Sequence, residues 1–128
     1  GDDDSFLSRS QACARLAVSM AGRAAEEMLL DGDYTHGASG DIASATDLAT
    51  RMVTAWGMSR LGVSALDPDR AFGLGEKIHA EVESLVNEGL ERAREILREH
   101  RGLLEKVVAE LLDEETIDLD RMRLLQAA

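Results

Sequence analysis

Aromatic residues, proline and cysteine are all scarce in this sequence. Aromatics make up 3% of its 128 residues, and there is one proline and one cysteine. The core must therefore be built from aliphatic side chains and methionine, and a chain with so little proline favours long helices. A single cysteine cannot form an internal disulfide. Cys13, which lies between two alanines, is expected to be a small core residue.

The sequence also lacks an excess of positive charge and any long apolar run. Its 14 Lys and Arg are scattered among 25 Asp and Glu, which gives a net charge of -11. Nucleic acid and anionic membrane surfaces bind clustered cations, so neither is expected as a partner. No apolar run approaches the ~20 residues of a membrane span, so the chain itself is expected to be soluble.

The amino end has neither an initiating Met nor a basic leader. Residues 1–4 read GDDD, which is not the pattern of a signal peptide. This acidic start is typical of a cut inside a longer protein. We therefore expect any anchor or motor of the parent protein to lie upstream of this chain.

Complete catalytic motifs are missing as well. The chain has three histidines, His36, His79 and His100. No two of them are four positions apart, so there is no HExxH pair and a closed zinc site from this chain alone is not expected. The glycines at 37 and 40 are not followed by the Lys-Ser/Thr of a phosphate-binding loop. Neither Cys13 with a histidine nor His36, Ser39 and Asp41 has a pattern that supports a nucleophile with its base.

Helical periodicity dominates what is present. Apolar residues recur at helical spacing over residues 8–30, 41–56, 76–98 and 103–112, with Ser8 as the expected first cap. Asp118 is expected to cap one more short helix. We predict one all-α domain over residues 1–128, a bundle of four main helices with antiparallel neighbours and a short C-terminal helix. The predicted inward faces contain Leu16, Met20 and Ala24; Ile42, Ala45, Leu48, Ala49, Met52, Val53 and Trp56; Ile78, Val82, Leu85, Val86, Leu90, Ala93, Ile96 and Leu97; and the apolar pairs of residues 103–112.

Glycines and one long irregular segment give further expectations. Gly22 and Gly89 lie inside predicted helices, where glycine is unfavourable, so each is expected to mark the close approach of another backbone. Residues 58–75 have no clear period. A segment of that length inside a compact domain can line a cleft, pack as a lid or be poorly ordered.

Three acidic residues are the candidates for chemistry. Asp41 follows a glycine-rich loop at a helix start, where a carboxylate suits metal ligation or proton transfer. It equally suits a simpler role, offsetting the positive end of the helix dipole by about 0.3–1 kcal/mol. Glu26 and Glu27 point about 100° apart on one helix, so they cannot share a role. Glu27 can pair with Arg23 across one turn, although both acids can also be plain solvated residues.

Three segments, taken in order, resemble the protease domain of FtsH-type ATP-dependent zinc metalloproteases, the membrane-bound AAA proteases. Residues 21–27 read AGRAAEE, residues 37–62 read GASGDIASATDLATRMVTAWGMSRLG, and residues 115–118 read ETID. The resemblance covers nearly the whole chain. It implies the C-terminal helical part of that peptidase domain, without the HExxH part, the AAA ATPase and the membrane helices.

The resemblance assigns specific roles to two residues. Asp41 matches the aspartate that completes the family's zinc site beside two histidines of the HExxH helix, which leaves the fourth position for water. Glu26 matches the first acid of the GRAAEE segment and would orient the ligands through hydrogen bonds. Ala21 and Gly40 depart from the family pattern, yet neither change removes a ligand. The isolated chain is expected to be inactive and to bind zinc weakly.

For the parent protein, the resemblance implies an ATP-dependent zinc metalloendopeptidase that degrades protein substrates. Zinc and ATP would be its cofactors, and a homo-hexamer its assembly. It would be anchored in a membrane through segments absent from this chain, with the protease facing the bacterial cytoplasm or an organelle interior. The alternative is a non-catalytic helical module that only packs subunits into a ring. An intact HExxH upstream would favour the enzyme.

Overall fold

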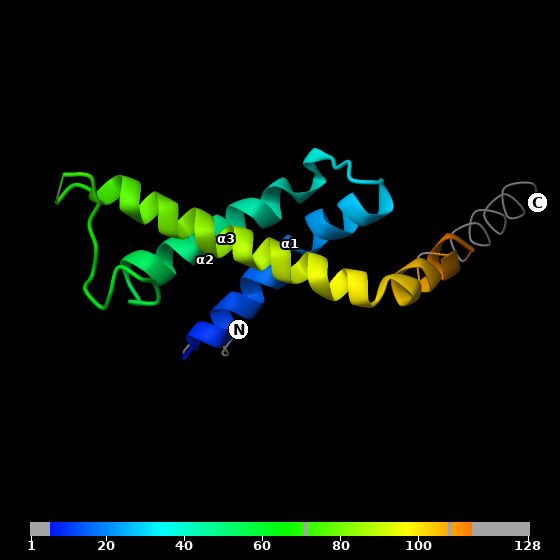
Figure 1. Ribbon diagram of the computed structural model, residues 1–128, viewed down its shortest axis with the longest axis horizontal. Helices are drawn as coiled ribbons and strands as arrows, with labels where there is room; N and C mark the ends of the chain where they lie inside the picture. Colours follow the sequence, from blue (N-terminus) through cyan, green and yellow to red (C-terminus); the bar gives the residue numbers. More distant parts are fainter. Residues whose placement is uncertain (1–5, 71, 108, 114–128) are drawn as a thin grey trace, which may run out of the picture. The chain divides into compact units, whose positions relative to one another are not determined.

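A computed structural model describes residues 6–70, 72–107 and 109–113 of the chain. These residues form helices and loops, without a strand among them, which confirms the all-α class (Figure 1). The named elements are α1 (Arg9–Leu29), the 3-10 helix η2 (His36–Ala38), α2 (Ser39–Thr54) and α3 (Leu74–Glu99). Residues 1–96 and 97–128 form two compact units, which are described separately below. The predicted extent of the domain stays a prediction.

Helix α1 begins and ends where the sequence predicts. Ser8 caps it, because its Oγ accepts a hydrogen bond from Gln11 N at 3.1 Å while Gln11 Oε1 accepts one from Ser8 N at 2.9 Å. This reciprocal capping box satisfies two backbone donors that would otherwise lack partners. The inward face is also as predicted; its buried residues are Ala12, Leu16, Ala17, Met20 and Ala24. Cys13 is partly buried against the same core.

Helix α2 runs back along α1 after the short connection that contains η2 (Figure 1). Its buried face is formed by Ala45, Leu48, Ala49, Met52 and Val53, as predicted. Ala12, Ala45 and Ala49 are fully buried, so small side chains contribute to the core of this unit. The interpretation of Trp56 as an inward-facing residue is wrong: α2 ends at Thr54, and the indole beyond it is 39% exposed.

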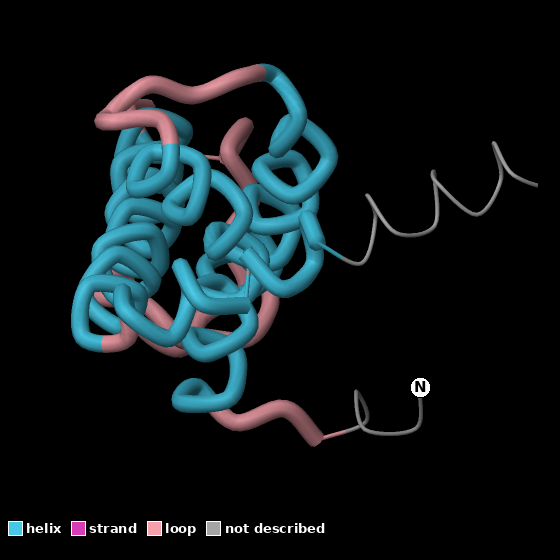
Figure 2. Tube along the Cα trace, turned by 90° about the vertical axis from the view of Figure 1, so that its right-hand side faces the viewer, coloured by secondary structure: helices cyan, strands magenta, loops and turns pink. Residues whose placement is uncertain are grey.

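Helix α3 completes the core of the first unit. Ile78, Val82 and Leu85 join the hydrophobic cluster of α1 and α2, and Figure 2 shows the helices side by side with loops joining their ends. A Cβ placed on Gly89 would lie 2.9 Å from Leu16 Cβ, so this glycine marks the predicted close approach of α1. Ile96, predicted to face inward, is 45% exposed instead.

The core contains no aromatic side chain. Every aromatic residue of the chain is exposed, namely Phe6, Tyr34, Trp56 and Phe72. No polar or charged residue is buried among the described residues. The largest fully buried side chains are Leu16, Met52 and Val53, which confirms the expected aliphatic and methionine core.

The irregular segment after α2 is tied to the helices at several points. Gly57, with φ of 61°, turns the chain out of α2, and a Cβ there would meet Val63 Cα at 3.0 Å. Leu66 N donates to Thr54 O at 2.8 Å. Arg60 donates to Glu81 of α3 from its backbone N at 3.0 Å and from its guanidinium at 2.8 Å. Of the three expectations for residues 58–75, lining a cleft is met by Ser59 and Arg60, which line a small pocket described below.

In the second unit, residues 101–107 and 109–113 are helical, and the break before them is a turn at His100. Arg101 and Glu105 pair across one turn at 2.9 Å. The apolar face predicted to require a cover is exposed: Leu103, Val107, Leu111 and Leu112 have exposed fractions of 61%, 43%, 58% and 57%. The predicted helix after Asp118 lies outside the described residues. In the part of the chain that the structure describes, no helix is long and apolar enough to cross a bilayer.

Candidate functional site

Asp41 lies in the first turn of α2, and the residue is exposed. Its carboxylate forms no hydrogen bond or ion pair with any described residue. The position is compatible with both interpretations from the sequence, because a first-turn acid faces the helix dipole and an exposed, unpaired carboxylate is open to a ligand from outside.

Gly22 of α1 lies directly beneath Asp41. A Cβ built on Gly22 would lie 3.7 Å from Asp41 Oδ2, which is the only described neighbour within 4 Å. We expected the backbone of another segment to approach Gly22. That expectation is wrong, because the group that approaches it is the side-chain carboxylate of Asp41. The distance is an ordinary van der Waals contact, so alanine fits at this position and a longer side chain would displace the carboxylate.

Glu26 holds the loop that leads into η2 and α2. Its Oε2 accepts hydrogen bonds from Thr35 N at 2.8 Å and from Thr35 Oγ1 at 2.6 Å. Thr35 Oγ1 in turn accepts one from Gly37 N at 3.1 Å, which caps η2. The hydrogen bonds of Glu26 thus go to the loop that precedes Asp41. They fix the backbone four to six residues before Asp41, and hydrogen bonds to a charged acceptor are among the stronger ones in proteins.

Glu27 serves a different partner, as its position on the helix predicts. Its carboxylate accepts from Arg23 Nε at 3.0 Å, the predicted pair across one turn. It also accepts from Arg94 of α3, at 2.8 Å from Nε and 3.0 Å from Nη2. Arg23 completes the arrangement by placing its guanidinium carbon 3.4 Å from the centroid of the Tyr34 ring. The interpretation of both acids as merely solvated is therefore wrong.

Arg94, and to a lesser extent Arg23, lower the pKa of Glu27 below its ordinary value of 4.5. A carboxyl group whose pKa is depressed by folding stabilises the protein above its unfolded pKa, and this contribution is lost as the pH falls through the folded pKa. We expect Glu27→Gln to lower the free energy of unfolding by about 1 kcal/mol at pH 7, since the pair is only partly buried. The difference from the wild type should shrink as the pH falls below 4.5.

Urea unfolding at a series of pH values measures this difference. Glu95→Gln is the matched control, because Glu95 is exposed on α3 and has no partner among the described residues. A Glu27→Gln deficit that stays constant down to pH 3 would contradict the ionic role of Glu27.

Three residues of this site, Tyr34, Thr35 and Arg94, were not predicted from the sequence. Thr35 stands nine positions after Glu26, and Arg94 is 67 positions from Glu27. Neither separation has a helical period, so no local pattern indicates the contact. Position 35 had one weak signal, since Thr before a glycine loop is a common cap.

The histidines do not assemble a metal site within this chain. His36 lies exposed in η2, and His79 Nε2 lies 3.2 Å from Glu83 Oε1 on the surface of α3, as expected for a helix-surface residue. Across the described ranges, no three His, Cys, Asp or Glu side chains lie close enough to hold one ion.

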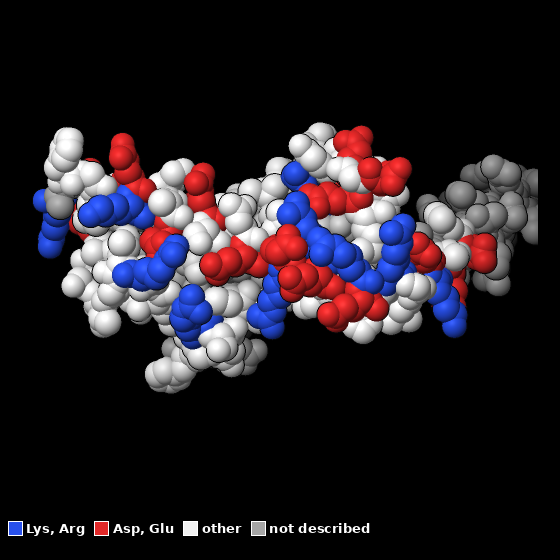
Figure 3. Space-filling model, in the orientation of Figure 1, with Lys and Arg blue, Asp and Glu red and all other residues white. Residues whose placement is uncertain are grey.

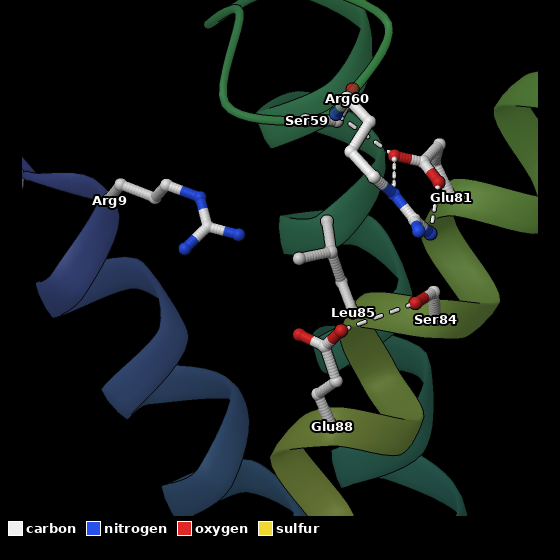
Figure 4. Close-up of a pocket in the computed structure, with 7 residues that line it drawn as sticks. All are labelled: Arg9, Ser59, Arg60, Glu81, Ser84, Leu85 and Glu88. Atoms are coloured by element: carbon white, nitrogen blue, oxygen red, sulfur yellow. Dashed lines mark hydrogen bonds and ion pairs between the residues drawn. The ribbon is translucent and has the colours of Figure 1, made fainter.

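A small pocket of about 140 Å³ lies away from Asp41, between the start of α1, the irregular segment and α3 (Figure 4). Arg9 and Arg60 line it with Glu81 and Glu88, and Leu85 lies between them. Arg60 is paired with Glu81, and Arg9 Nε donates to Met58 O at 3.2 Å. Ser84 Oγ donates a hydrogen bond to Glu88 Oε1 at 3.3 Å, so these two lining groups are also paired (Figure 4). Basic and acidic side chains are interleaved on the face seen in Figure 3.

The amino-acid sequence of the chain is similar to those of a known peptidase family. A family model for peptidase family M41 matches residues 1–125. The chain is 42% identical, over 91% of its length, to an ATP-dependent zinc metalloprotease FtsH of Lancefieldella parvula, and 35% identical, over 95%, to one of Trieres chinensis. It is 35% identical, over 91%, to the ATP-dependent zinc metalloprotease YME1L of Drosophila melanogaster. It spans 20%, 22% and 17% of these relatives' lengths.

Proposed function

The chain belongs to peptidase family M41, and on that premise we propose that it forms the C-terminal helical part of an ATP-dependent zinc metalloendopeptidase that degrades proteins. The printed names of the relatives support this activity for the parent protein. The HExxH part, the ATPase and the membrane anchor would be supplied by the rest of that protein. Its partners would be protein substrates and further copies in a homo-hexamer, with the protease facing the bacterial cytoplasm or an organelle interior.

Asp41 is the residue that we assign to the metal. Its carboxylate is exposed and has no partner among the described residues, so no internal interaction has to be broken before it can bind an ion. A carboxylate oxygen is an ordinary zinc ligand, and catalytic zinc sites use three protein ligands. Since one carboxylate is not enough, two imidazoles would come from the HExxH helix. The bound zinc would lower the pKa of a water molecule and polarise the peptide carbonyl.

The other residues of the site act on the position of Asp41. Gly22 leaves room for its carboxylate, and Glu26 fixes the loop before it through Thr35. The resemblance assigns Glu26 to hydrogen bonds that orient the metal ligands, and its hydrogen bonds to Thr35 would do so by restricting the loop that leads to Asp41.

A chimera tests the proposal. This chain would replace the matching fifth of the Trieres chinensis FtsH, and hydrolysis of an unfolded protein would be followed with ATP and zinc. We expect ATP-dependent hydrolysis. A chimera that assembles but neither holds zinc nor cleaves protein would refute the proposal and support the alternative, a non-catalytic assembly module.

The isolated chain gives a separate prediction. We expect no peptidase activity and a zinc dissociation constant in the millimolar range or weaker, because one carboxylate cannot replace two imidazoles. Equilibrium dialysis with zinc measures this, with His36→Ala and Asp41→Ala as companions. Stoichiometric binding at micromolar zinc that survives both substitutions would show another metal site and contradict the assignment.

A further inference from the structure

We infer that Arg94, on α3, is a positioning residue for Asp41 and acts through Glu27, Arg23 and the loop at residues 34–37. The inference rests on the proposed function only because that function makes Asp41 the residue that binds the metal. The series of contacts from Arg94 to the loop requires no metal. It links a helix 67 positions further along the sequence to the start of α2.

The first link is the pairing of Arg94 with Glu27. Two guanidinium nitrogens of Arg94 lie 2.8 and 3.0 Å from the two carboxylate oxygens, a bidentate arrangement with a defined orientation. Only 16% of the Glu27 side chain and 34% of the Arg94 side chain are exposed. Glu27 is therefore held from α3, and its Oε1 is presented to Arg23 at 3.0 Å.

The second link is the stacking of Arg23 on Tyr34. The guanidinium lies 3.4 Å from the ring centroid, and 21% of the Arg23 side chain is exposed. Tyr34 is 52% exposed, so burial in a core does not hold it in place. Stacking on a guanidinium that Glu27 already orients restrains this ring.

The third link is the loop itself. Tyr34 is followed by Thr35, which is bonded to Glu26 and to Gly37 N. Two residues of α1 therefore hold two consecutive residues of the loop. Arg23 holds Tyr34 by stacking, and Glu26 holds Thr35 by hydrogen bonds. The loop continues through η2 into α2, where Asp41 lies in the first turn.

Without Arg94, Glu27 would keep only its pair with Arg23 across one turn. Such pairs are weak and exchange readily with water, so Arg23 would leave Tyr34 more often. The expected consequence is more frequent opening of the loop while the helices stay packed, because none of the core residues is involved. Local opening of this kind is measured by amide exchange.

The test is amide exchange of the 128-residue chain by NMR. For Arg94→Met we expect the amides of Thr35 and Gly37 to open about fivefold more often, while the core amides of Met52 and Val53 change much less. Arg94→Lys, which keeps the charge but not the bidentate geometry, should give an intermediate increase. Arg92→Met is the matched control, because Arg92 is exposed on α3 and has no partner among the described residues.

A second readout follows the stacking directly. The ring of Tyr34, the sole tyrosine, should shift the side-chain proton signals of Arg23 upfield, and Arg94→Met should reduce that shift. Equal changes at the loop and core amides, or an unchanged Arg23 signal, would overturn the inference. If Arg94→Met does not fold, Arg94→Lys decides between the same outcomes. These measurements involve no metal, so their failure is distinct from failure of the FtsH chimera to cleave protein.

Discussion

Asp41→Asn is expected to reduce peptidase activity of the FtsH chimera by about 100-fold or more and to lower its zinc content. Changing a residue that is hydrogen-bonded to a metal ligand typically lowers metal affinity or activity by about 10–100-fold, and loss of a ligand itself should lower them more. Asparagine has nearly the shape of aspartate but lacks its charge, so the fold should be retained. Zinc per subunit, measured by mass spectrometry, and the rate of protein hydrolysis together give the result.

Asp47→Asn is the matched control. Asp47 is exposed on the same helix and has no partner in the part of the chain that the structure describes, so neither zinc content nor rate should change. If Asp41 only offsets the helix dipole, Asp41→Asn would alter stability by about 0.3–1 kcal/mol and leave zinc and activity intact. That outcome would refute its assignment as a ligand.

Gly89→Ala is expected to destabilise the first unit by about 1–3 kcal/mol. The added Cβ would lie 2.9 Å from Leu16 Cβ, 3.0 Å from Leu16 C and 3.2 Å from Ala17 N. Two of these atoms are backbone, which cannot rotate away, so α1 and α3 would have to separate. Thermal and urea unfolding measure the loss.

Gly40→Ala has the opposite expectation. Nothing lies within 4 Å of a Cβ on Gly40, which is in the first turn of α2, so alanine should stabilise by about 0.5–1 kcal/mol through its helix propensity. If Gly89→Ala and Gly40→Ala changed the free energy of unfolding by the same amount and in the same direction, the close approach of α1 to Gly89 would not be the cause of the Gly89→Ala effect.

Periodicity alone was enough to predict the helices and most of the core. The apolar stripes of α1, α2 and α3 are buried where the spacing placed them, because each helix packs one face against the others. The exceptions lie at helix ends. Trp56 follows the last turn of α2, and Ile96 is the last residue of the first unit. At both positions the apolar spacing continues past the point where the helices pack against each other.

The candidate site was predictable only in part. Asp41, Glu26 and Gly22 stand in segments that resemble a known family, and the pair of Arg23 with Glu27 follows from spacing on one helix. The contacts of Thr35 with Glu26 and of Arg94 with Glu27 depend on how the chain folds back. Such contacts leave no trace in local sequence patterns, so only the three-dimensional arrangement reveals what the two acids do.

The fully buried alanines of α1 and α2 bear on how much movement the site permits. Long side chains in a helix contact can change rotamer and let two helices slide, whereas methyl groups offer no such freedom. Gly22 and the first turn of α2, where Asp41 lies, therefore have little freedom to shift. Together with the hydrogen-bonded loop at residues 34–37, they restrict where the Asp41 carboxylate can lie.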